Sequence, residues 1–226
     1  DLNFDNGESG EFSFIIDGKL YDGSSGWELL SFASAKDDHQ GDGAALRLEG
    51  MGELTGIELT LTYLLYPGLP VIRKQISFLN KTGKEIKLEA LDVEKLKLGF
   101  GYVESVVYAG YGREKHLGTY IGNWDDALLA IHSYAENAGI LLGNEAPGVL
   151  KRTDFNTVKD QVNIGLTQRG DMYPFCKYIQ AGESWTAPRV FVIPYLKASG
   201  PWQAMNHELA DFERKYMGLR IFENKH

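Results

Sequence analysis

The chain has 226 residues, of which 43% are hydrophobic, and a formal net charge of -8 from 31 acidic and 23 basic residues. This composition indicates a globular protein with a substantial core, and the negative charge disfavours nucleic acid as a partner because phosphate backbones would be repelled. No run of 18 apolar residues occurs, so no membrane partner is expected.

The single cysteine, Cys176, excludes an intrachain disulfide and a cysteine-based zinc site. Its setting, "YPFCKYI", is typical of a strand, so we expect a buried and inert thiol. We expect no cofactor and no metal. The chain begins with a polar stretch, so we expect no signal peptide within it, but it lacks an initial Met, so an earlier signal peptide could have been removed. The compartment is therefore undetermined, with a periplasmic or secreted location favoured over a cytoplasmic one.

Short segments with apolar and polar residues in alternation recur along the chain, separated by clusters of Gly, Asp, Asn and Pro. The segment 57–66 is the clearest, with Ile57, Leu59 and Leu61 on one face. The predicted strands are 11–16, 27–33, 44–49, 57–66, 71–80, 85–93, 94–100, 103–109, 127–134, 139–143, 160–168, 174–180 and 189–195. So many short strands predict an all-β fold of two large packed antiparallel sheets.

Two turns punctuate the middle of this pattern. "PGLP" at 67–70 predicts a turn, because its two prolines cannot donate to a ladder and Gly68 tolerates a positive φ. "NKTG" at 80–83 predicts a short hairpin loop with Gly83 in the left-handed conformation.

One segment has helical periodicity. Its apolar residues are spaced 3, 4, 3 and 4 apart: Trp202, Met205, Leu209, Phe212 and Tyr216. Ser199 is the expected cap, Pro201 falls in the first turn and Gly218 follows the end. We therefore predict one domain, with the sheets in 1–198 and a helix in 199–218 that packs on them or leads to another domain.

Two stretches resemble a known family. "TYLLYPGLPVIRKQISFLNKTGKEIKLEAL" is similar to part of the N-terminal domains of family 36 glycoside hydrolases, the alpha-galactosidases and their relatives. The matching positions are Tyr66, Pro67, Pro70, Arg73, Asn80 and Gly83. "IQAGESWTAPRVFVIPY" is similar to a second family segment, at Gly182, Glu183, Pro188 and Tyr195.

The resemblance implies a β-supersandwich of the galactose mutarotase-like type. In the family this domain precedes a (β/α)8 barrel that carries both catalytic carboxylates. No catalytic residue can be carried over, because no barrel pattern occurs up to His226. The implied role is a non-catalytic accessory domain that packs against a barrel of the same chain, contacts carbohydrate and takes part in a possible homo-oligomer.

The stretch 108–127, "YAGYGREKHLGTYIGNWDDA", has the composition of a sugar-binding surface. Flat aromatic rings can cover the apolar face of a sugar, and polar side chains can bind its hydroxyls. The candidates are Tyr111, Arg113, Tyr120, Asn123, Trp124 and Asp125. The same residues could instead form a glycine-rich connection whose tyrosines pack on the sheet. Trp27 and Trp185 are further possible platforms, the latter in an expected turn.

Other motifs are weaker. Asp125 and Asp126 suit a hairpin turn better than a catalytic pair, and Asp37, Asp38, His39 and Asp42 lack calcium-loop spacing. A mutarotase would need a histidine acid and a carboxylate base, with candidates His116, His132, Glu114 and Glu145, which no local motif joins. "NKT" at Asn80 matches a glycosylation acceptor, although the hairpin loop explains it equally well.

Three functions therefore stay open: the accessory domain, a stand-alone carbohydrate-binding module, and a mutarotase-like epimerase. We rank the epimerase last because a fold alone does not confer an activity.

Overall fold

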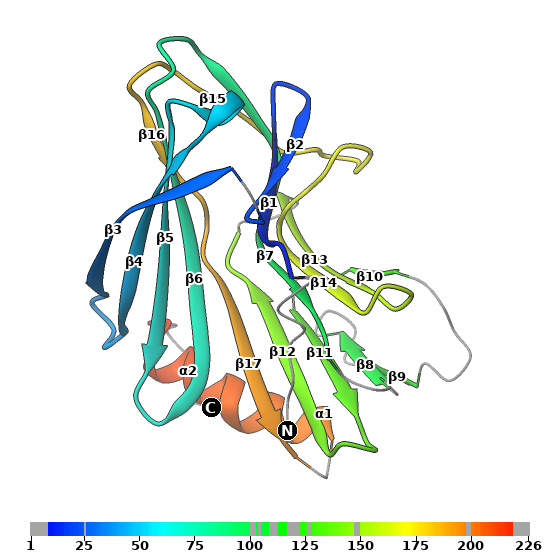
Figure 1. Ribbon diagram of the computed structural model, residues 1–226. Coiled ribbons are helices and arrows are strands. Elements are labelled where there is room, and N and C mark those ends of the chain that lie inside the picture. The colour runs from blue at the N-terminus through cyan, green and yellow to red at the C-terminus, as the bar shows by residue number, and fades with distance from the viewer. Residues whose placement is uncertain are drawn as a thin grey trace, which may run out of the picture.

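The computed structural model describes residues 9–24, 26–99, 103, 105–108, 113–116, 123–125, 128–146, 150–197 and 200–218. Two sheets face each other (Figure 1), and every strand pairing in this part of the chain is antiparallel. The predicted all-β two-sheet sandwich is confirmed.

The larger sheet has ten strands and the smaller has seven. The order in the larger sheet is β3 (Trp27–Lys36), β4 (Asp42–Gly50), β5 (Ile57–Tyr66), β6 (Leu69–Asn80), β17 (Val190–Leu196), β12 (Ala138–Asn144), β11 (Leu128–Ser133), β8 (Ser105–Tyr108) and β9 (Arg113–His116), with β16 (Ser184–Thr186) beside β6. The order in the smaller sheet is β10 (Asn123–Asp125), β13 (Lys151–Asn156), β14 (Gln161–Leu166), β7 (Ile86–Lys97), β1 (Glu11–Ile16) and β2 (Lys19–Asp22), with β15 (Cys176–Ile179) beside β7.

The main core fills the space between the sheets. Phe14 of the smaller sheet meets Phe78 of the larger sheet edge-on, with ring centroids 5.1 Å apart. Both side chains are buried, as are the inward residues Leu59 and Leu61 of β5, so the alternation in 57–66 identified the correct face.

The turn between β5 and β6 is shorter than predicted. Tyr66 pairs with Leu69, so Pro67 and Gly68 make the turn and Pro70 already lies in β6. Gly68 has φ of 74°, which matches the glycine position of a type II turn with proline before it.

The prediction of two strands at 85–93 and 94–100 is wrong, because β7 is one strand interrupted by a bulge. Ala90 has φ of 50°, and the pairing with β1 shifts register between Ser13 and Ile15. The extra residue moves the inward positions from Leu88 to Leu91, both fully buried. This change of phase in the sequence resembled the end of one strand and the start of another.

The C-terminal helix consists of α1 (Pro201–Ala204), a π-helical turn (Met205–Leu209) and α2 (Ala210–Lys215). Figure 1 shows it running across the lower part of the larger sheet. Leu209, Phe212 and Tyr216 form a second core with the outward side of that sheet. The residue that precedes the helix is Gly200 instead of the expected Ser199, which lies outside the described residues.

The apolar stripe is displaced at the start of this helix. Trp202 is 37% exposed, and Ala204 is buried in its place. A π turn contains one residue more than an α-helical turn, so residues before it are rotated relative to a 3.6-residue pattern.

Cys176 is exposed, so the expectation of a buried thiol is wrong. It pairs with Glu89 in register, and directly opposite side chains share a face. Cys176, in β15, therefore lies beside Glu89 on the outward face of the smaller sheet. Within the described ranges, no helix is long and apolar enough to cross a membrane.

Candidate functional site

The six predicted sugar-binding residues fall partly outside the described structure. Tyr111 and Tyr120 are not among the described residues. Arg113 begins β9, at one margin of the larger sheet, whereas Asn123, Trp124 and Asp125 form β10, at one margin of the smaller sheet. The backbone thus places Arg113 on a different sheet from the other three.

Asp125 lies in a strand, paired with Asp154, so the hairpin turn expected at this residue is wrong. Asp126 lies outside the described residues. The turn-forming composition of "NWDD" gave no sign of the pairing with β13, which is distant in sequence.

The residues that carry the family resemblance hold the fold together. Arg73 is 5% exposed and donates from Nε and Nη2 to the two carboxylate oxygens of Glu145, at 2.7 and 2.5 Å. Its Nη1 donates to the Tyr66 hydroxyl at 3.0 Å, and that hydroxyl donates to Asp37 at 2.7 Å. This Arg73 network joins β5, β6, the end of β12 and the β3–β4 loop.

The network fixes the charge state of its members. Burial raises the pKa of Tyr66 to about 12, so the hydroxyl keeps its proton. Burial opposes ionisation of Asp37, but hydrogen bonds from Tyr66 and from the amides of Gly41 and His39 hold its pKa below the ordinary value. Asp37 thus stabilises the β3–β4 loop. The described residues contain no group of acidic, His or Cys side chains that could hold a metal.

Asn80 is fully buried and binds four groups of the hairpin and its neighbour. Its amide nitrogen donates to the carbonyls of Lys84 and Ile179 at 2.7 and 2.9 Å, and its oxygen accepts from Thr82. A glycan would have to be attached to this nitrogen, so the hairpin explanation of "NKT" is correct. Gly83 has the predicted positive φ, at 78°.

The histidine and carboxylate candidates for a mutarotase do not form an open acid–base pair. His132 is fully buried, between the rings of Tyr134 and Tyr195. Glu145 is engaged through both oxygens by Arg73. His116 and Glu114 lie in β9, whose backbone alone is described.

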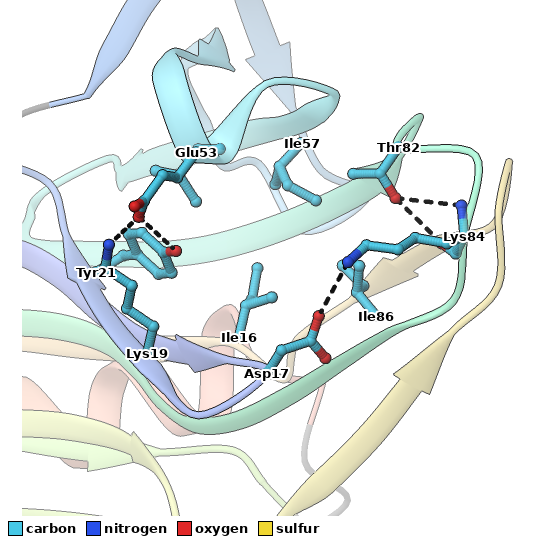
Figure 2. Close-up of a pocket in the computed structure, with 10 residues that line it drawn as sticks. Ile16, Asp17, Lys19, Tyr21, Glu53, Ile57, Thr82, Lys84 and Ile86 are labelled. Carbon is cyan, nitrogen blue, oxygen red and sulfur yellow. Dashed lines mark hydrogen bonds and ion pairs between the residues drawn. The ribbon is translucent and has the colours of Figure 1, made fainter.

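A pocket of ≈ 320 Å³ is lined by the β1–β2 turn, the 3-10 turn Gly52–Leu54 and the β6–β7 hairpin (Figure 2). The β1–β2 turn lies at the end of the sandwich opposite the helix (Figure 1). The floor of the pocket consists of buried core residues: Ile16, Leu54, Ile57 and Ile86. Its wall carries the ionisable and hydroxyl side chains Asp17, Lys19, Tyr21, Glu53, Thr82 and Lys84. We call it the β1–β2 pocket.

Two acid–base pairs stand on opposite sides of this pocket. Figure 2 shows Glu53 with Lys19 and Tyr21 on one side, and Asp17 with Lys84 on the other. The Lys19 ammonium donates to Oε2 of Glu53, and the Tyr21 hydroxyl lies 3.5 Å from the same oxygen. The Lys84 nitrogen lies 3.9 Å from Oδ2 of Asp17. Sequence reasoning missed all of these residues, because they are scattered over 68 positions with no motif; only the frequent charges beside turns hinted at them.

Two other pockets are less suited to a polar ligand. One, of ≈ 390 Å³, lies beside the Arg73 network and contains Glu145, Glu213 and Phe191. The other, of ≈ 400 Å³, is mainly apolar and contains Trp185. Trp185 lies in strand β16 instead of the expected turn, and it stacks on Phe175 at 5.5 Å as a half-buried part of the core margin. Trp27 likewise packs edge-on against Phe12.

No family model matches the chain, and no curated protein sequence matches it. Among solved structures it is similar to a family 36 alpha-galactosidase variant of Geobacillus stearothermophilus in complex with stachyose, with a TM-score of 0.69 and 13% identity over 95% of this chain and 33% of that one. It is also similar to the alpha-galactosidase of Lactobacillus brevis, with a TM-score of 0.67 and 11% identity over 91% and 31%. The chain thus spans about a third of the length of the enzymes it matches, and its fold is that of one part of the family 36 alpha-galactosidases.

Proposed function

We propose that the chain is a non-catalytic N-terminal accessory domain of an alpha-galactosidase-like glycoside hydrolase. It packs against a catalytic barrel of the same chain and helps to shape carbohydrate binding. The observation that supports this most strongly is the coverage of the structural match. The likeness extends over 91–95% of this chain but only 31–33% of two alpha-galactosidases.

The carboxylates in the two polar pockets of the described residues fit a non-catalytic role. A glycosidase needs two carboxyl groups that converge on one bond, about 5–10 Å apart. In the β1–β2 pocket both carboxylates are 46% or more exposed and lie beside lysines, which is not the apolar setting that keeps a catalytic acid protonated. In the pocket beside Arg73, Glu145 is committed to Arg73, which leaves Glu213 as the other carboxyl there. Burial raises the pKa of Glu213, yet one acid does not make a hydrolase.

The test begins with the natural coding sequence. We expect the reading frame to continue beyond His226 into a segment with alternating strands and helices. The longer protein should release p-nitrophenol from p-nitrophenyl α-galactoside, and the 226-residue chain alone should not. A reading frame that ends at His226, or hydrolysis by the isolated chain, would refute the proposal.

The second candidate is a self-contained carbohydrate-binding module that uses the stretch 108–127. It is favoured by the position of Asn123–Asp125 on β10, the terminal strand in the order of the smaller sheet. A glycan array followed by calorimetry tests it, with Trp124→Ala as the diagnostic variant. Binding that is unchanged by this substitution would count against the stretch.

A further inference from the structure

The β1–β2 pocket combines an apolar floor with a wall of balanced charge. Asp17 and Glu53 carry two negative charges, and Lys19 and Lys84 carry two positive charges, so the lining is neutral as a whole. A strongly charged ligand would meet as much repulsion as attraction. The lining therefore favours a neutral ligand with many hydroxyl groups.

The arrangement of the charges suits adjacent hydroxyls in particular. A hydroxyl both donates and accepts a hydrogen bond. Each acid–base pair offers a carboxylate acceptor beside an ammonium donor, so two neighbouring hydroxyls can bind one pair. Since the pairs Lys19–Glu53 and Asp17–Lys84 face each other across the pocket, one ring with hydroxyls on both sides could engage both.

These ion pairs are also weak enough to accept a ligand. The side chains are 46–73% exposed, and the Lys84–Asp17 separation of 3.9 Å exceeds hydrogen-bond length. Exposed pairs of this kind contribute little to stability, so their donors and acceptors can turn to a ligand at small cost.

The floor explains why the ligand should be a ring and not an open-chain polyol. Ile16, Ile57 and Ile86 line the base of the pocket with hydrocarbon (Figure 2). A pyranose ring carries C–H groups on a face that can cover such a surface, and Tyr21 adds an aromatic wall. The volume of ≈ 320 Å³ is at the low end for ligand sites, which fits one sugar ring.

We propose that the β1–β2 pocket binds one neutral pyranose ring through its two acid–base pairs. This inference rests on the proposed function, because it names a site and a ligand class for the carbohydrate contact. The pocket is separate from the stretch 108–127 in sequence and is built from β1, β2, the 3-10 turn Gly52–Leu54 and the β6–β7 hairpin.

The test is a titration of the isotopically labelled 226-residue chain with galactose, glucose and the open-chain polyol sorbitol, followed by amide NMR shifts. We expect saturable shifts at Tyr21, Thr82 and Lys84 with the ring sugars, with dissociation constants of about 1 mM or weaker, and no saturation with sorbitol. Glu53→Gln and Lys84→Met should each weaken binding roughly tenfold, because each removes a charge-assisted hydrogen bond.

The matched control is Lys36→Met, which removes an equally exposed lysine from the Lys36–Asp42 ion pair on β3 and β4. It should leave the titration unchanged. Thermal melting of every variant verifies folding. The inference is overturned by the absence of saturable shifts, by shifts confined to 105–125, or by binding that survives both pocket substitutions. None of these results bears on the reading frame beyond His226, so the accessory-domain proposal is judged separately.

Discussion

Arg73 and Glu145 meet in a two-point ion pair beneath the C-terminal helix, with Nε–Oε1 and Nη2–Oε2 distances of 2.7 and 2.5 Å. The Arg73 guanidinium also lies 5.9 Å from the centre of the Phe212 ring. One side chain of β6 thus connects the far strand β12 to the helix that packs on the sheet.

Loss of one partner of the Arg73–Glu145 pair should destabilise the protein much more than loss of a surface ion pair. We expect Glu145→Gln to lower the free energy of unfolding by about 3 kcal/mol, because it leaves the buried Arg73 charge with less compensation. Urea denaturation measures the loss. Asp211→Asn, which breaks the exposed Lys215–Asp211 pair, is the control and should change the free energy of unfolding far less. Equal losses in the two variants would show that the network is not structurally important.

Phe212 should determine whether the helix stays on the sheet. It is fully buried and contacts the rings of Tyr66 and Phe191, each at 5.1 Å. We expect Phe212→Ala to lower the free energy of unfolding by about 3–5 kcal/mol. Hydrogen exchange should rise first in 201–216 and later in β5 and β6. Trp202→Ala, at a 37% exposed position of the same helix, is the control and should change the unfolding free energy and the hydrogen exchange little. A uniform rise over the whole chain would contradict independent release of the helix.

The acid dependence of stability should differ in sign between two carboxyl groups. Hydrogen bonds from Lys81 and Arg47 hold the pKa of Glu58 below 4.5. The resulting stability is present above 4.5 and lost as the pH falls through the lowered pKa. The difference in unfolding free energy between wild type and Glu58→Gln should therefore shrink on acidification, as urea titrations between about pH 7 and pH 3 would measure.

Asp92 provides the opposite case. Burial raises its pKa above 3.8, against the hydrogen bonds from Ser13 and Gln168. A raised pKa gives stability that is present at low pH and lost as the pH rises through that value. Wild type should thus lose stability relative to Asp92→Asn as the pH increases over the same series. Parallel slopes for the two pairs of proteins would contradict these assignments.

The exposed margin of β3 should promote self-association. Phe32 is 70% exposed and Leu29 55%, and within the described structure β3 pairs only with β4. Long apolar edge strands are prone to pair with other chains. Phe32→Lys should reduce light scattering of concentrated or warmed samples without a change in unfolding free energy beyond about 0.5 kcal/mol. Val158→Lys, at a turn residue that is 71% exposed, is the control. If both substitutions act alike, added charge and not the edge is responsible.

The sequence predicted those parts of the fold in which one residue pattern persists. Ile57 to Leu61 alternate because β5 has one face on the core, and Gly83 marks a turn because its φ is positive. Strand β13 was not predicted, since "KRTDFN" is mostly polar and the strand is held by backbone pairing with β10 and β14. Trp202 was assigned to the buried stripe because nothing local announces a π turn.

From the sequence we predicted the class of ligand, a carbohydrate, but not the β1–β2 pocket. Aromatic and glycine-rich composition in 108–127 is a local signal, and its residues can be read directly. The β1–β2 pocket depends on tertiary structure, because Asp17, Glu53 and Lys84 line one pocket only when three turns meet at one end of the sandwich. The apolar–polar alternation within one strand does not indicate which turns lie close together in the fold.

The bulge at Ala90 affects how this domain should be aligned with remote relatives. At 11–14% identity, a gap of one residue in β7 is easily treated as noise. Here that single position decides whether Leu91 and Val93 or Asp92 and Glu94 are equated with the interior of another protein. An alignment that omits the bulge would equate apolar positions with acidic ones over the remainder of the strand. Any ancestry or function inferred from those positions would then be wrong.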